Sequence, residues 1–172
     1  MPKIAAAVLA LVCTMLFSVP MSAQLLPRGN VYGGVSYGQL TDVINKQSYR
    51  GWNGSAEDLP FARFPHLGFV LDASGFYRSG VTMYSGFFGP RLSTNLGKWR
   101  PFVHAMGGIR HIKSNGFVYN PYAIDFGGGA DYKLWFKNFS WRLQGDFMYA
   151  HDTALHAYQN DYRASTGIVW RF

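Results

Sequence analysis

Much of this 172-residue chain alternates large apolar side chains with small, polar or charged ones. The alternation is clearest in residues 140–150, where Arg142 and Asp146 lie between aromatic and aliphatic side chains. It returns in residues 124–134 and 162–172. Successive side chains of a β-strand point to opposite faces, so a period of two predicts strands with two chemically different faces. We therefore expect an all-β protein.

Five further segments alternate more weakly, and together with the three clear ones they predict eight strands. These segments are residues 30–38, 48–56, 67–74, 84–93 and 102–111. Their lengths approach the roughly 9 to 11 residues that a tilted strand needs to cross a membrane. Turn-forming stretches separate the strands at residues 40–47, 57–65, 78–80, 95–98, 113–120, 137–138 and 153–160.

The composition indicates how such strands hide their apolar groups. Only 15% of the residues are charged and 17% are aromatic, whereas an ordinary soluble domain has roughly 25% charged residues. Beyond residue 23 no apolar run approaches the length of a membrane-spanning helix. Inside lipid every backbone N–H and C=O must be paired, which leaves a closed β-barrel as the spanning structure. The expected fold is an eight-stranded antiparallel up-and-down transmembrane β-barrel.

The first residues are typical of a secretory signal peptide. A basic residue, Lys3, precedes an apolar run at residues 4–19, and small residues lead to a plausible cleavage point after Ala23. An uncleaved membrane helix is the alternative, which Pro20 disfavours by shortening the run. We expect a signal peptide at residues 1–23 and one barrel domain at residues 24–172. The only cysteine, Cys13, would leave with the signal peptide, so no thiol chemistry is expected in the mature chain.

The aromatic residues fall into two groups when both chain ends are placed on the periplasmic side. One group would lie at the periplasmic rim: Trp99, Trp135, Phe136, Phe139, Trp141, Trp170 and Phe172. The other would lie at or beyond the opposite rim: Tyr37, Tyr49, Tyr77, Tyr84, Tyr119, Tyr122, Tyr149, Tyr158 and Tyr162. Two aromatic girdles are typical of transmembrane barrels. The strand count did not use the aromatics, so this layout supports it independently.

Four short motifs carry a resemblance to a known family. They are Phe-Phe-Gly-Pro-Arg at residues 87–91, Pro-Phe-Val-His-Ala at 101–105, Gly-Gly-Gly-Ala-Asp at 127–131 and Gly-Ile-Val-Trp-Arg-Phe at 167–172. The chain resembles the small outer-membrane protein β-barrel domain family over most of its mature length. The resemblance implies an eight-stranded barrel in the outer membrane of a bacterial cell envelope. Its final Ile168, Trp170 and Phe172 are similar to the signal that the barrel-assembly machinery recognises, which implies that machinery as a partner.

The charged side chains occupy one face of the alternating strands and have mixed signs, so they are expected to pair in a narrow lumen. This predicted ion-pair network consists of Asp72, Arg91, Arg110, Asp125, Asp131, Lys133, Arg142, Asp146, Arg163 and Arg171. An eight-stranded barrel is just wide enough for side chains to fill it. A proton or ion path along the same column remains an alternative. So does a soluble lipocalin-like carrier, which would instead point its apolar face inward.

No catalytic, cofactor-binding or metal-binding residues are expected, and the favoured function is a non-enzymatic structural or surface-interaction role. His111, His151 and His156 lack the tight spacing of a metal site. The alternative enzyme is an outer-membrane lipid A acyl hydrolase, because His111 and Ser114 faintly resemble its His-x-Ser-Asn pattern. In that pattern the two residues are two apart on one strand face. Here they are three apart, which places them on opposite faces of a regular strand.

The net charge of +7 gives a second indication of partners. Lys46, Arg50, Arg78 and Lys113 are expected at the rims, where they would attract lipid headgroups or lipopolysaccharide phosphates. Simple solvation of these surface cations is the alternative. Outer-membrane lipid and lipopolysaccharide are therefore the expected partners, nucleic acid is not, and we expect a monomer.

Overall fold

The structure is a computed structural model that describes residues 29–41, 46–58, 66–114, 116–152 and 157–172. The expected signal peptide at residues 1–23 lies outside these residues, and so do parts of several expected turns. Within the described part of the chain, no helix is long and apolar enough to cross a membrane.

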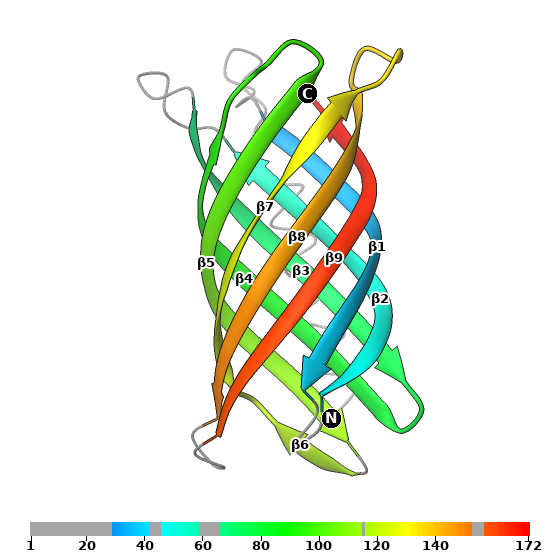
Figure 1. Cartoon of the computed structure of the whole chain (residues 1–172), viewed down its shortest axis with the longest axis vertical. Coiled ribbons are helices and arrows are strands. Elements are labelled where there is room, and N and C mark those ends of the chain that lie inside the picture. Colours follow the sequence, from blue (N-terminus) through cyan, green and yellow to red (C-terminus); the bar gives the residue numbers. More distant parts are fainter. Residues whose placement is uncertain (1–28, 42–45, 59–65, 115, 153–156) are drawn as a thin grey trace, which may run out of the picture.

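All the described regular structure belongs to one antiparallel sheet (Figure 1). Its strands are β1 (Gly29–Thr41), β2 (Lys46–Asp58), β3 (Leu67–Arg78), β4 (Val81–Ser93), β5 (Trp99–Ser114), β6 (Phe117–Tyr119), β7 (Tyr122–Lys133), β8 (Phe139–Asp152) and β9 (Ala157–Arg171). β1 pairs with both β2 and β9, and β4 pairs with β5. β6 has three residues and pairs only with the end of β5. The other eight strands close into a barrel, which confirms the expected fold.

The barrel has two distinct ends. β1 begins and β9 finishes at one of them, the terminal end, which is uppermost in Figure 1. The opposite end carries β6, and we call it the loop end. β3 and β4 meet there through a two-residue turn in which Gly80 has a φ of 77°. Such a positive φ suits glycine, whose missing Cβ removes the steric penalty.

The strands extend further than the alternation alone indicates. β1 continues to Thr41, β2 runs from Lys46 to Asp58, and β9 starts at Ala157. Each of these strand ends lies in a stretch expected to be a turn. Pairing with an adjacent strand holds these residues extended even where their types favour turns: Thr41 pairs with Lys46, and Ala157 with Asp152. The additional residues lengthen the barrel wall at the loop end, and at the terminal end they include Glu57 in the wall.

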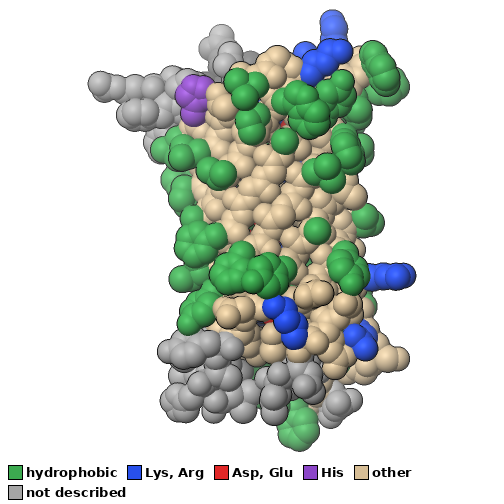
Figure 2. Space-filling view, viewed as in Figure 1, with side chains coloured by type: hydrophobic (Ala, Val, Ile, Leu, Met, Phe, Trp, Pro, Cys, Tyr) green, Lys and Arg blue, Asp and Glu red, His purple; other side chains and the backbone are tan. Residues whose placement is uncertain are grey.

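Side chains alternate between the outside and the interior, with the orientation expected from the sequence. In β8, Leu143 is 47% exposed on the outer wall, whereas the adjacent Arg142 is fully buried inside. Figure 2 shows hydrophobic side chains spread over the outer wall, with Lys and Arg side chains toward its two ends. The bulky apolar face therefore forms the outside of the barrel, as a lipid-facing wall requires.

Aromatic side chains gather on the outer wall near both ends, as predicted. Trp99 packs against Tyr132 at the terminal end, with ring centroids 4.8 Å apart. At the loop end Tyr77 and Tyr84 meet edge to face, 6.0 Å apart. Tyr49 departs from the prediction, because it lies near the loop end but points into the interior and is 1% exposed. Its inward position follows from strand parity, since Arg50 beside it takes the outward one.

Candidate functional site

The barrel interior brings together most of the charged residues predicted for the lumen. Eight of the ten are buried there: Asp72, Arg91, Arg110, Asp125, Asp131, Arg142, Asp146 and Arg163. Arg171 is partly exposed and pairs with Asp131, with Nη2 3.1 Å from Oδ2. Lys133 is exposed, and no ion pair among the described residues includes it. It has the inward parity of Asp131 but is the last residue of β7, where a long side chain reaches past the wall to water.

Four buried acidic or basic residues were not in the predicted set. They are Glu57, Arg100, His104 and Asp161. Glu57 and Asp161 fall within or beside expected turns, and Arg100 precedes the expected start of its strand. Continuing the period of two by one step from each strand would have placed all three inside. His104 has the same parity as Arg110 in the strand expected at residues 102–111, but the predicted network did not include it.

The cluster nearest the terminal end, which we call the rim cluster, contains two carboxylates and four guanidinium groups. Its members are Glu57, Asp131, Arg91, Arg100, Arg142 and Arg171. Glu57 pairs with Arg91 and with Arg142, whose Nη1 lies 2.7 Å from Oε1. Asn30 Nδ2 also donates to Glu57 at 3.0 Å. These donors come from β1, β4 and β8, so one carboxylate joins strands from around the barrel.

Asp131 is the second carboxylate of the rim cluster and receives a two-pronged contact. Arg142 Nε lies 2.6 Å from Oδ1 and Arg142 Nη2 donates to Oδ2 at 3.1 Å. Such bidentate pairs are geometrically specific as well as strong. The Arg91 guanidinium lies over the ring of Phe102, 3.4 Å from its centroid, which adds a cation–π contact. The pairing thereby fixes the rotamers of the arginines that fill this end.

The central cluster lies deeper in the barrel and has the opposite balance of charge. It comprises Asp72, Asp125, Asp146, His104 and Arg163. Arg163 contacts all three carboxylates, with Nη1 2.9 Å from Asp72, Nη2 3.3 Å from Asp125 and Nε 2.6 Å from Asp146. One guanidinium thus serves three carboxylates from β3, β7 and β8.

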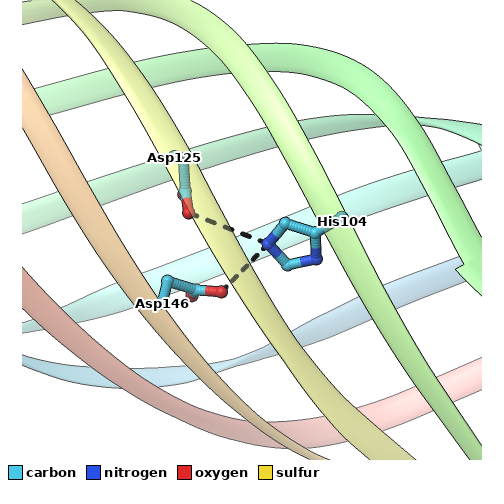
Figure 3. A group of neighbouring side chains, drawn as sticks. All are labelled: His104, Asp125 and Asp146. Atoms are coloured by element: carbon cyan, nitrogen blue, oxygen red, sulfur yellow. Dashed lines mark ion pairs between the residues drawn. The ribbon is translucent and has the colours of Figure 1, made fainter.

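His104 completes the central cluster from β5 (Figure 3). Its Nε2 lies 3.1 Å from Asp146 Oδ1 and 3.7 Å from Asp125 Oδ1. The sheet register places His104 opposite Gly127 and Gly127 opposite Asp146. A Cβ on Gly127 would collide with both Asp146 Oδ1 and His104 Nε2. The imidazole and the carboxylate can meet only because a glycine lies between them.

The interior toward the loop end is mainly apolar. Most of its buried apolar side chains belong to one cluster, which Val70 joins from the terminal-end part of β3: Leu40, Tyr49, Val70, Phe76, Val81, Met83, Phe87, Met106, Ile112, Ala123, Met148 and Ala150. Among the described residues a single ion pair lies in this half, between Arg110 and Asp161. Thr41 donates to Asp161 Oδ1 through its backbone N–H at 2.7 Å and its hydroxyl at 2.8 Å. Toward the loop end the polar column therefore narrows to the Arg110–Asp161 pair and the buried Ser114 and Gln159, beside this apolar packing.

The described residues balance their interior charge and do not assemble the expected alternative catalytic pair. The buried or partly buried carboxylates are Glu57, Asp72, Asp125, Asp131, Asp146 and Asp161, and the guanidinium groups are Arg91, Arg100, Arg110, Arg142, Arg163 and Arg171. Their formal charges cancel while His104 is neutral. His111 faces outward and bonds Asn120, with Nδ1 2.7 Å from Oδ1, whereas Ser114 is buried on the inward face.

Comparisons with known proteins identify the fold. No protein-family model matches the chain, and no curated protein matches it in sequence. Among solved structures, Neisserial surface protein A gives a TM-score of 0.68 at 12% identity, over 84% of this chain and 97% of that one. The N-terminal β-barrel domain of Pseudomonas aeruginosa OprF gives 0.61 at 15% identity, over 83% and 97%.

A third solved structure carries the same fold. The Yersinia pestis attachment invasion locus protein Ail, in complex with the heparin analogue sucrose octasulfate, gives a TM-score of 0.53 at 12% identity, over 86% of this chain and 100% of that one. At these identities the likeness identifies the architecture. The expected resemblance to small eight-stranded outer-membrane barrels is confirmed at the level of the fold.

Proposed function

We propose that this protein is a non-enzymatic outer-membrane β-barrel with a structural or surface-interaction role in the bacterial cell envelope. The observation that carries the proposal is the pairing of an apolar outer wall with an interior filled by its own side chains. Such an interior leaves the outer surface and the loops as the parts that meet other molecules. The fold shared with Neisserial surface protein A and with Ail, the attachment invasion locus protein, supports the same assignment.

The positions of the apolar side chains argue against the two transport alternatives, the lipocalin-like carrier and the ion path. A lipocalin-like carrier keeps an apolar cavity for its ligand and a polar outside, whereas Leu71, Val103 and Ile109 are more than half exposed on the outer wall here. An ion path needs a polar column through the whole barrel. Met83 and Ile112, at most 1% exposed, belong to the apolar packing that narrows this column to the Arg110–Asp161 pair, in which the two charges neutralise each other.

The acyl hydrolase alternative lacks its dyad among the described residues. A general base must lie within hydrogen-bond reach of the nucleophile it activates. His111 and Ser114 project from opposite faces of β5, so the barrel wall separates them. Comparison of lipid A mass spectra from cells with and without the protein tests this directly. Unchanged acylation is the expected result, and a lost or added acyl chain would contradict the proposal.

Cations at the loop end support contacts with anionic lipid. Lys46, Arg50, Arg78 and Lys113 are all exposed, and all lie in the loop-end part of their strands. Arg50 pairs in register with Tyr37 and Tyr77, so it lies among the aromatic side chains of the outer wall near the loop end. Phosphate groups of lipopolysaccharide would meet cations at this height in the outer leaflet. Exchanging all four cations for glutamine is expected to weaken binding to lipopolysaccharide vesicles but not to neutral phospholipid vesicles.

Membrane fractionation with heat-modifiable gel migration tests the outer-membrane assignment. The protein is expected in the outer-membrane fraction, with a band that shifts only after boiling because a closed barrel resists detergent. We also propose that Ile168, Trp170 and Phe172 form the signal for the barrel-assembly machinery, since all three lie exposed at the terminal end. Recovery of the protein as a soluble monomer in buffer without detergent would overturn the assignment.

A further inference from the structure

Three side chains of the kinds that bind metal ions converge inside the barrel (Figure 3). His104 comes from β5, Asp125 from β7 and Asp146 from β8, which are consecutive strands around the wall. One donor atom from each, His104 Nε2 and the Oδ1 atoms of both aspartates, lies within 4.8 Å of the other two. All three residues are buried.

The distances from the imidazole nitrogen to the two carboxylate oxygens match those between ligands of one small cation. Nitrogen and carboxylate oxygen bind Zn²⁺ at about 2.0 to 2.2 Å, so two ligands of a tetrahedral ion lie about 3.4 Å apart. His104 Nε2 is 3.1 Å from Asp146 Oδ1 and 3.7 Å from Asp125 Oδ1. These two distances bracket the tetrahedral value, so small side-chain adjustments would admit the ion.

Two of the three donor atoms have no hydrogen-bond partner among the described residues. They are His104 Nε2 and Asp125 Oδ1, in side chains that are 2% and 0% exposed. The Oδ2 atoms of Asp125 and Asp146 face Arg163, which leaves the Oδ1 atoms directed at the imidazole. Gln144 donates to both oxygens of Asp146 at 3.0 and 3.1 Å, as groups around metal-binding carboxylates commonly do. Buried polar atoms without a partner are costly, so this arrangement calls for a further ligand.

The charge of the central cluster points to a divalent ion. Its three carboxylates, including Asp72, face the single guanidinium of Arg163, so the cluster itself has a local excess of two negative charges while His104 is neutral, and the balancing guanidinium groups lie in the rim cluster. A neutral imidazole is also the form that binds a metal. A divalent cation would remove the excess charge that makes burial of this cluster expensive.

Gly127 provides the space. It lies between His104 and Asp146 in the sheet register, two residues after Asp125 on the same strand. Its missing Cβ leaves room where the imidazole and the carboxylate approach each other. The same vacancy is where an ion shared by the three side chains would lie.

We propose that His104, Asp125 and Asp146 bind a divalent transition-metal ion, with Zn²⁺ as the fitting example, inside the barrel. One imidazole nitrogen and two carboxylate oxygens suit Zn²⁺, whereas Mg²⁺ and Ca²⁺ prefer oxygen ligands alone. The ion would cross-link β5, β7 and β8 and stabilise the folded barrel by mass action. This site goes beyond the proposed envelope role and does not depend on it.

The test measures Zn²⁺ in protein purified in detergent, unfolded in urea and refolded with either ZnCl₂ or a chelator. Because the ion is present while the barrel forms, it does not have to enter a closed interior. After desalting, the wild-type protein refolded with Zn²⁺ should retain about one ion per chain and unfold at a higher temperature than the chelator-treated sample. Co²⁺ in place of Zn²⁺ should give the visible absorption of a tetrahedral site with a nitrogen ligand.

Paired variants locate the ion. His104→Gln and Gly127→Ala should lose the retained ion and the thermal shift, whereas the controls His111→Gln and Gly145→Ala should keep both. His111 is an exposed histidine of the same strand, and a Cβ at Gly145 meets no atom within 4 Å. Heat-modifiable migration reports whether each variant folds, and Asp125→Asn replaces His104→Gln should the latter fail. Equal Zn²⁺ content in wild type and the folded site variants, or no retained ion and no thermal shift in wild type, would overturn the site.

Discussion

The two halves of the barrel interior are filled by different chemistry. Toward the terminal end, arginines and carboxylates pair around Glu57, Asp131 and Asp146. Toward the loop end, apolar side chains such as Phe76 and Ile112 pack together, and Arg110–Asp161 is the one ion pair there among the described residues. The packed apolar side chains need only matching volume, whereas each group of the charged half needs a specific partner. The charged half is therefore the more sensitive to loss of a single side chain.

The contrast has an energetic basis. Burying a paired charge is close to neutral overall, because desolvation offsets the attraction between the partners. Removing one partner leaves the other charge buried without compensation, which is strongly destabilising. Removing a methyl group from the apolar half loses only its burial and leaves a small cavity. Four substitutions test this difference, three read as a change in the free energy of unfolding in detergent micelles and one as folding into lipid vesicles.

The largest effect is expected for Arg163→Met. This change preserves a long side chain but leaves Asp72, Asp125 and Asp146 without their guanidinium, at a cost of about 3 to 5 kcal/mol. Urea titration of tryptophan fluorescence measures it. Adding Asp146→Asn should cost less than the sum of the two single changes, because the residues share one network. A loss below about 1 kcal/mol for Arg163→Met would show that the halves do not differ as described.

Much of this contrast follows from strand parity, which the sequence reveals. Arg142 and Leu143 are adjacent, so their opposite chemistry in a strand predicts one inside and one outside. The sequence alone could not show which inward residues meet, because the register across eight strands brings together His104 and Asp146, which are 42 positions apart (146 − 104). Nor could it show that the inward apolar residues of several strands form a single layer.

The boundaries of the strands limited the prediction of the charged half. Glu57 follows turn-like glycine and serine residues, and its pairing with β1 and β3 is what holds it in the wall. Asp161 precedes the first firmly alternating residue of β9 and becomes inward only because β8 pairs with β9 beyond it. Lys133 was predicted to lie inside but is exposed at the end of β7, because parity alone does not reveal where the wall ends.

A substitution on the outer wall tests whether charged side chains are tolerated only in the barrel interior. Leu143→Arg is expected to cost up to about 2 to 4 kcal/mol, because a charge placed on the lipid-facing wall must leave water. The neighbouring Arg142→Leu should still insert into lipid, although it disrupts the rim cluster. Measurement of folding into lipid vesicles separates the two effects. The reverse order of insertion would mean that inside and outside are interchanged.

A smaller effect is expected in the apolar half for Ile112→Val. Ile112 is 1% exposed within the interior cluster, so loss of one methylene should cost about 0.5 to 1.5 kcal/mol. Ile109→Val is the matched control, since Ile109 lies on the same strand but is 58% exposed on the outer wall. Detergent can fill the space left there. Equal costs at the two positions would remove the claim that the apolar half is a packed core.

The smallest effect is expected for Lys133→Gln, at most about 0.5 kcal/mol, because its exposed side chain makes no ion pair among the described residues. Arg171→Gln is the informative comparison, since Arg171 is also near the terminal end but its guanidinium contacts Asp131. Asp131 keeps Arg142 in either variant, so the cost of Arg171→Gln should be modest yet larger than that of Lys133→Gln. Urea titrations at low and high salt measure both. The alternation pattern would assign these two residues the same role. They differ because Lys133 lies at the end of the wall, whereas Arg171 still reaches Asp131 inside it.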